Sequence, residues 1–339
     1  MKNVFLYSIA LTFGLLMSCG GKSGTKIETT DLDSLVKMYP DSMPILIKHG
    51  QKMIKEMDFS KAIADAAKAY HKDSNNIEAR MLYADVLNNR PTRTFTDVLN
   101  AQRHFKVIIK KEPKNTKALV GLATTYSQQQ DFEKAFQYIN TALKVNPRYR
   151  DAYVLKGTIY LQLGNPKLAK SSYETAVQQD PKFFEAYLML GSLYETDNDP
   201  ICLEYYTTAA KIEPNNPDVL YSLAYASQKF DKVNQAKRLY KKMIQLDSTY
   251  HEALFQLGYI KQYIENQRDS AEYYYRSAIE TNPQFVEAYH NLGLCLEADG
   301  EKSLALKSFA KALKYNPNFE LSRTEATRIN KNFDPYKER

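Results

Sequence analysis

A proline that returns in the same sequence context about every 34 residues is the feature that most limits how this chain can fold. It occurs in the segments KKEPKN, KVNPRY, QQDPKF, KIEPNN, ETNPQF and KYNPNF, at Pro113, Pro147, Pro181, Pro214, Pro283 and Pro317. The successive separations are 34, 34, 33, 69 and 34 residues, and the long one equals two units, of which the first ends at QLDSTY without a proline. A period of this length indicates a helical repeat, in which each unit buries its apolar face against its neighbours.

Each unit contains two apolar patterns with helical spacing. In residues 150–181 the segment LGNP separates two stretches, and each stretch places three residues on one helix face. These residues are Tyr153, Gly157 and Tyr160 in the first stretch, and Ala169, Tyr173 and Ala176 in the second. The small residues allow two helices to approach closely, and the proline that follows ends the second helix.

Two units show the pattern most completely. The unit that begins at Val286 has Tyr289, Leu292, Gly293, Ala305, Phe309, Ala312 and Pro317, and the unit that begins at Phe184 has Tyr187, Leu190, Gly191, Tyr194, Tyr206, Ala209 and Pro214. This pattern resembles the tetratricopeptide repeat (TPR), although tryptophan, common at the bulky first position, is absent from the chain. The resemblance implies an all-α fold, a TPR α-solenoid in which helix hairpins form a right-handed superhelix. It also places Tyr187, Tyr194 and Tyr289 at core positions.

The repeat pattern predicts the organisation of residues 31–332 as a solenoid of about eight repeats. Six units are regular, at 116–149, 150–183, 184–216, 217–250, 251–285 and 286–319. Two degenerate units precede them, at 77–115 and 43–76. Residues 320–332 are expected to form a polar capping helix, because stacked repeats need one at a free end. Residues 333–339 are then a tail.

The N-terminus has the layout of a secretory signal peptide over residues 1–18. One positive charge, Lys2, precedes an uncharged run from residue 4 to residue 17. That run is shorter than the roughly 20 residues that a spanning helix needs. The residues LMSC, ending at Cys19, resemble the bacterial lipobox, which implies a lipid on the cysteine; an ordinary signal peptide that is cut and discarded is the alternative. The glycine-rich residues 19–30 would be a flexible tether.

The remaining residues offer no chemistry typical of an enzyme. The five histidines lack metal-ligand spacing, so we expect no catalytic residue, no metal and no cofactor. Cys202 and Cys295 lie within apolar helical patterns and are expected to be small core residues, with a long-range disulfide as the alternative. The net charge of +7 is interleaved with acids and comes with no nucleic-acid-binding motif, so nucleic acid is not expected as a partner.

A candidate binding surface follows from the first helices of two adjacent units. The positions that border the concave groove in the resembled family hold five aromatic residues here: Tyr221, Tyr225, Phe255, Tyr259 and Tyr263. Their repetition at i and i+4 predicts a contiguous strip for the apolar anchors of a partner. Packing of these rings against neighbouring helices is an equally weighted alternative.

These features together predict a membrane-anchored lipoprotein of the bacterial cell envelope, facing the periplasm, that acts as an interaction scaffold or adaptor. The expected partner is an envelope protein or peptide in an assembly, secretion or protease-adaptor role, with the membrane reached through the N-terminal lipid and homo-oligomerisation left open. A second hypothesis is a glycan- or peptidoglycan-binding accessory component, in which Gln228, Gln256 and Gln262 accompany the aromatic rings.

Overall fold

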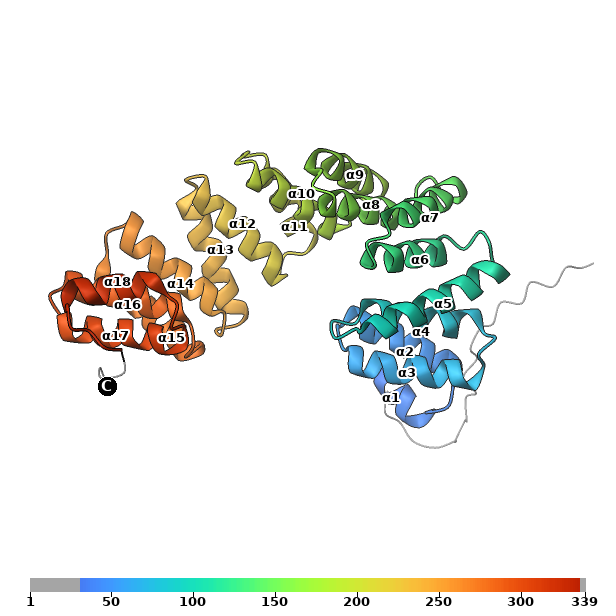
Figure 1. Cartoon of the computed structure of the whole chain (residues 1–339), viewed down its shortest axis with the longest axis horizontal. Helices are drawn as coiled ribbons and strands as arrows, with labels where there is room; N and C mark the ends of the chain where they lie inside the picture. Colours follow the sequence, from blue (N-terminus) through green and yellow to red (C-terminus); the bar gives the residue numbers. More distant parts are fainter. Residues whose placement is uncertain (1–30, 336–339) are drawn as a thin grey trace, which may run out of the picture. The chain divides into compact units, whose positions relative to one another are not determined.

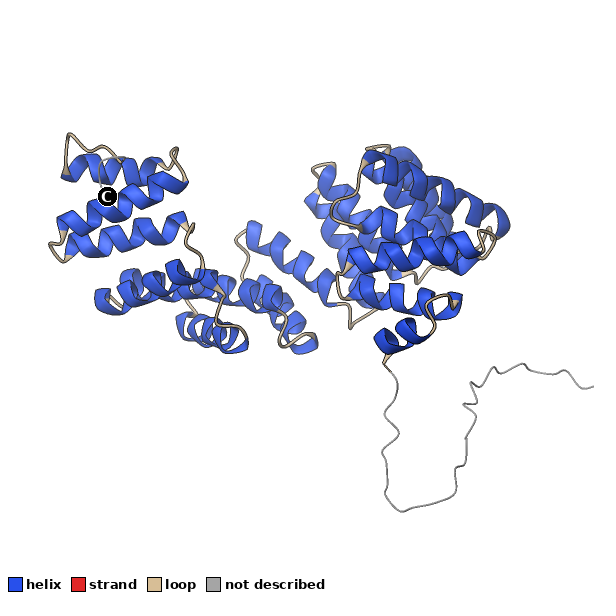
Figure 2. Cartoon of the chain, turned by 90° about the horizontal axis from the view of Figure 1, so that it is seen from below, coloured by secondary structure: helices blue, strands red, loops and turns tan. Residues whose placement is uncertain are grey.

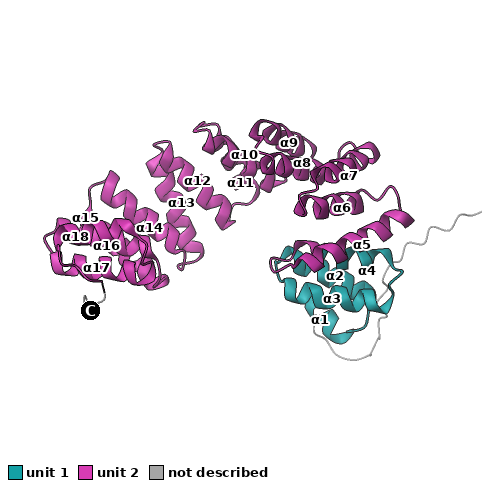
Figure 3. Cartoon of the chain, in the orientation of Figure 1, with its two compact units in different colours: residues 1–86 teal, residues 87–339 magenta. Residues whose placement is uncertain are grey.

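The computed structural model describes residues 31–335, and every regular element in that range is a helix (Figures 1 and 2). This confirms the prediction of an all-α fold. The predicted signal peptide, Cys19 and the tether lie outside the described residues. None of the described helices combines the length and the apolar character needed to cross a bilayer. The chain divides into two compact units, residues 1–86 and 87–339, with the boundary inside α4 (Ile77–Asn89) (Figure 3).

The described part of the first unit contains α1 (Leu32–Met38), α2 (Met43–Lys55), α3 (Phe59–Lys72) and most of α4. Helices α2 and α3 pack as a hairpin around buried Leu46, Met53, Ala62 and Ala66. Helix α1 differs from the others because none of its residues is buried.

A polar network joins α1 to this hairpin. The ring of His49 in α2 bonds to Asp65 of α3 through Nδ1 at 2.5 Å and to Asp33 of α1 through Nε2 at 2.8 Å. Lys52 also donates to Asp33, at 2.8 Å. Burial alone would lower the pKa of His49, but the bonds to Asp65 and Asp33 outweigh it and raise that pKa above its ordinary value. The charged imidazole is therefore stabilised between two carboxylates.

The second unit continues as a series of helix pairs in which each helix packs on the next. It holds α5 (Phe95–Lys111), α6 (Thr116–Gln128), α7 (Phe132–Val145), α8 (Arg150–Gln162), α9 (Pro166–Gln179), α10 (Phe184–Thr196), α11 (Cys202–Ile212), α12 (Pro217–Lys229), α13 (Val233–Leu246), α14 (His251–Tyr259), the π-helix η1 (Ile260–Ile264), α15 (Arg268–Thr281), α16 (Val286–Ala298), α17 (Lys302–Tyr315) and α18 (Glu320–Ile329). Each of the six regular sequence units contains one pair. Helix α18 occupies the segment expected to cap the series.

Glycines in the first helix of a pair lie directly against an aromatic ring of the second. A Cβ on Gly157 would come within 2.8 Å of Tyr173, and one on Gly191 within 2.4 Å of Tyr206. Gly258 meets Tyr275 and Gly293 meets Phe309 in the same way. The close helix approach predicted from the small residues is therefore present, and the ring on the second helix fills the space.

The location of the core tyrosines corrects one expectation. Tyr187, Tyr194 and Tyr289 are only half-buried, whereas the fully buried rings are Tyr173, Tyr240, Tyr275, Phe105 and Phe309. Tyr173, Tyr275 and Phe309 lie against the glycine of the paired first helix, and Phe105 lies against Gly121 of the next pair. The first-helix tyrosines lie at the edge of the stack, where Tyr194 reaches Glu174 with its hydroxyl.

The turns between paired helices share one backbone requirement. Seven of them contain a residue with positive φ: Met57, Gln130, Gly164, Asn198, Asp231, Asn266 and Gly300. Two are glycine and two are asparagine, the residues that adopt this conformation most readily. These seven turns thus share a backbone geometry although their sequences differ.

Cys202 and Cys295 are both free thiols and fully buried. The expectation of small core residues is confirmed, and the disulfide alternative is wrong.

Candidate partner-binding surface

Three tyrosines from two neighbouring helix pairs line one hollow of about 390 Å³. They are Tyr225 of α12, Tyr259 of α14 and Tyr263 of η1, with exposed fractions of 43, 38 and 50%. Gln228, Lys229 and Ile264 complete the lining. We call this site the tyrosine hollow. Its three rings are large, partly apolar and accessible, as the anchor positions of protein interfaces commonly are.

The π-helical turn places Tyr263 in this hollow. The unit at 251–285 has 35 residues, one more than its neighbours' usual 34, and η1 takes up the extra residue within the first helix. The Tyr263 ring lies 4.6 Å from that of Tyr259, centroid to centroid. Lys237 and Lys261 both bind Glu265, directly after the π-helix. The turn is therefore held from two helices.

A second hollow of about 360 Å³ adjoins the first and shares Tyr225, Tyr259 and Gln228 with it. Its other lining residues are Phe255, Gln256, Glu287, His290, Asn291, Phe319 and Leu321. His290 holds the same position in its unit as Phe255 and Tyr221 hold in theirs, so the repeat offset could have identified it. Phe319 is the final residue of the last repeat, and Leu321 lies in the capping segment, where no repeat offset applies.

Two of the five predicted groove residues are mainly packing residues. Tyr221 is half-buried, lies edge-on to Tyr240 with centroids 6.0 Å apart, and accepts a hydrogen bond from Gln256 at 3.4 Å. Phe255 is half-buried and contacts Tyr275 and Phe285, at centroid distances of 5.6 and 5.1 Å. Of the five predicted groove residues, three have accessible rings and two mainly support the packing. That any of the five binds a partner stays a prediction.

Neutral polar groups predominate in the two hollows. A tyrosine hydroxyl is protonated at neutral pH, and burial raises the pKa of Tyr263 further. Burial lowers the pKa of His290, so this imidazole is neutral there too. Gln228 donates to Gln256 at 3.3 Å, while the Oε1 atom of Gln228 is buried without a hydrogen-bond partner in the described structure. The surface suits apolar and neutral polar groups better than charged ones.

Known proteins resemble this chain through its repeats. Family models of the tetratricopeptide repeat match residues 116–149, 151–183 and 286–319. The chain contains tetratricopeptide repeats. Repeats of this kind are typically protein-interaction modules without catalytic activity. Among residues 31–335 no group of three or more His, Cys, Asp or Glu side chains is placed to hold a metal ion.

Three relatives illustrate the extent of the likeness. The TPR-containing protein trd-1 of Caenorhabditis elegans is 29% identical over 115 residues, which are 34% of this chain and only 15% of the length of trd-1. The C-terminal part of a TPR protein from Cytophaga hutchinsonii is 18% identical, with a TM-score of 0.58 over 72% of this chain and 98% of that one. Human IFIT1 is 16% identical, with a TM-score of 0.61 over 88% and 76% of the two chains. At these identities the two structures support the TPR solenoid fold alone.

Proposed function

We propose that this TPR chain is a membrane-anchored interaction scaffold of the bacterial cell envelope, and that it binds a partner protein or peptide in the tyrosine hollow. The observation that carries the proposal is the convergence of Tyr225, Tyr259 and Tyr263 on one accessible hollow. Tyrosine is among the residues that contribute most binding energy at protein interfaces. The neutral surroundings favour a partner that inserts apolar or aromatic side chains.

The tyrosine hollow is tested by changing Tyr225 and Tyr259 together to alanine. Both rings are well exposed, so the helical signal and the melting temperature are expected to stay close to those of the wild type. Capture of the partner, first identified by crosslinking in intact cells, is expected to weaken tenfold or more, equivalent to about 1.4 kcal/mol. Tyr273→Ala is the matched control, because this tyrosine is 65% exposed and lines neither hollow.

Either of two results would contradict this proposal. Unfolding of the double variant would show that the rings stabilise the fold instead of a complex. Normal folding with unchanged capture would place recognition elsewhere on the chain.

The anchoring part of the proposal rests on Cys19 and its lipobox-like context. Several acyl chains, at about 0.8 kcal/mol per buried CH₂, would hold the chain durably on a membrane. Metabolic labelling with a clickable fatty acid is expected to mark the wild type and not Cys19→Ala. Equal labelling of both would mean that the N-terminus is an ordinary signal peptide.

Glycan binding is the second candidate, favoured by one observation. Gln228 lines the tyrosine hollow, so that a neutral amide side chain stands beside the rings on which a sugar could stack. Two other amides are less available, because Gln256 bonds to Tyr221 and Gln262 accepts from Tyr275. Titration with soluble peptidoglycan fragments separates the candidates: binding that the Tyr225/Tyr259 double variant abolishes would favour the glycan.

A further inference from the structure

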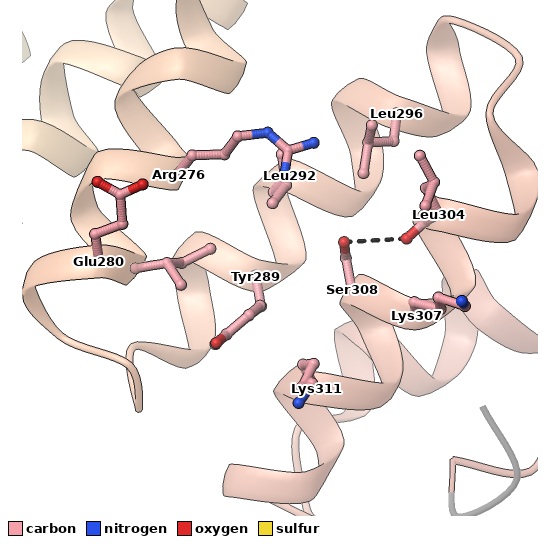
Figure 4. Close-up of a pocket in the computed structure, with 10 residues that line it drawn as sticks. Arg276, Glu280, Tyr289, Leu292, Leu296, Leu304, Lys307, Ser308 and Lys311 are labelled. Carbon is pink, nitrogen blue, oxygen red and sulfur yellow. Dashed lines mark hydrogen bonds between the residues drawn. The ribbon is translucent and has the colours of Figure 1, made fainter. Parts of the chain in front are cut away.

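Helices α15, α16 and α17 enclose another hollow, of about 330 Å³, that is separate from the tyrosine hollow (Figure 4). Tyr289 of α16 lines it, whereas the next residue, His290, lines the hollow beside Tyr225. Consecutive residues are about 100° apart around a helix. The two hollows therefore open on different faces of α16.

The floor of this hollow is apolar. Leu292 and Leu296 of α16 form it and are almost fully buried, and Ile279 of α15 adds to it. The hydroxyl of Ser308 is already satisfied, because it donates to the carbonyl of Leu304 at 3.1 Å (Figure 4). The Leu304 side chain on α17 is 44% exposed at the edge. The floor thus offers apolar contact and little hydrogen bonding.

The rim is cationic. Arg276, Lys307 and Lys311 line the hollow, against one carboxylate, Glu280. Arg276 is held by Glu272 at 2.8 Å. Lys307 and Lys311 lie one turn apart on α17, are exposed, and form no hydrogen bond or ion pair with any described residue. Two positive charges beside an apolar floor are therefore without an anionic partner in the described chain.

We infer that this cationic hollow binds an acidic segment of a partner protein. An apolar side chain of that segment lies on the leucine floor, and carboxylates beside it pair with Lys307 and Lys311. The volume is at the small end of ligand sites, roughly 300 Å³ and above, which allows one or two side chains. A membrane surface fits less well, because its acyl region is reached by projecting apolar side chains and this floor is recessed.

The test is a selection of random twelve-residue peptides displayed on phage against the full chain, with Lys307→Glu/Lys311→Glu as counter-target. Peptides that distinguish the two proteins are expected to carry Asp or Glu within two positions of Leu, Ile, Phe or Met. A synthetic copy of the best peptide is expected to bind the double variant at least tenfold more weakly than the wild type. Its affinity should also fall when NaCl is raised from 50 to 500 mM.

Two control variants make the result specific. Lys302→Glu/Lys314→Glu changes the same net charge on the same helix at exposed residues outside the hollow, and is expected to bind the peptide like the wild type. The Tyr225→Ala/Tyr259→Ala variant should also bind it normally, so failure of the proposed tyrosine hollow would not affect this inference.

Three results would overturn the inference. One is that the selected peptides carry no acidic residues. Another is that the Lys302/Lys314 control weakens binding as much as the Lys307/Lys311 variant, which would indicate unspecific charge attraction. The third is that no peptide is selected while vesicles with 30% phosphatidylglycerol bind the wild type and not the Lys307/Lys311 variant, which would indicate a membrane surface.

Discussion

At the scale of single residues, two glycines constrain the fold for different physical reasons. A Cβ on Gly191 would lie 2.4 Å from the ring of Tyr206, which is 3% exposed and bonds to Glu195, so the ring has nowhere to move. Gly300 has open space around it but a φ of +87°. At Gly191 there is no space for a side chain, whereas Gly300 has a backbone conformation that residues with a Cβ rarely adopt.

We therefore expect alanine at either position to lower the free energy of unfolding, and we expect a different change to reduce the loss in each case. Gly191→Ala should cost roughly 1–3 kcal/mol through overpacking, and Tyr206→Leu in the same chain should recover part of it. Gly300→Ala should cost about 1–2 kcal/mol through backbone strain, and Gly300→Asn less. Urea denaturation measures both. An unchanged melting temperature for Gly191→Leu would mean that the repeat register of this unit is wrong.

His49 provides a pH-dependent contact at the same scale. Its pKa is raised in the folded state, so its stabilising contribution is present below the ordinary histidine pKa of about 6.5 and is lost as pH rises through the folded value. Asp33, whose pKa is lowered by Lys52 and His49, loses its contribution only when pH falls below the usual Asp range. Asp65, Lys61, Asp31 and Glu56 are the other charged groups nearby. The contact is strongest in the mildly acidic range.

Hydrogen exchange of α1 measures this effect. After correction for intrinsic rates, its amides are expected to exchange more slowly at pH 5.5 than at pH 8.5. His49→Gln should remove the difference, whereas His71→Gln, at an exposed histidine of the same unit, should keep it. Equal protection of α1 at both pH values in the wild type would contradict the prediction.

At the scale of elements, helix existence and pairing could be predicted because the apolar period and the recurring proline are local signals. The π-helix η1 could not, since the 35-residue length of its unit shows an extra residue but not whether a loop or a helix accommodates it. Tyr187 and Tyr289 are expected in the core but lie at its edge. Equal spacing does not reveal which of two facing helices presents its ring to a glycine.

The π-helix also yields a prediction. Deleting Lys261 restores a 34-residue unit and should convert the turn to an α-helix, which rotates Tyr263 by about 100° relative to Tyr259. The circular dichroism signal should stay helical, while partner capture falls to the level of Tyr263→Ala. Wild-type capture by the deletion variant would show that the position of Tyr263 does not matter.

At the scale of the whole chain, the sequence allowed the TPR architecture to be predicted but only part of the candidate surface. Tyr225, Tyr259 and Tyr263 follow from the repeat offsets, and the structure adds which of their neighbours open to solvent. The cationic hollow escaped prediction because Arg276, Tyr289 and Lys307 come from three helices and share no offset. A repeat pattern identifies the positions that all units share. A site formed by residues that differ between units becomes visible only in the structure.

The packing of each helix mainly on its chain neighbours has a mechanical consequence. Among the described helices, the main contacts join elements that are neighbours or next neighbours along the chain, so under tension between the chain ends the pairs should yield one after another. Each yielding pair releases about 34 residues, or roughly 110–120 Å of extended chain at 3.3–3.6 Å per residue. In an optical trap this would appear as a series of similar steps, and the chain would lengthen under load while the pairs not yet opened stay folded.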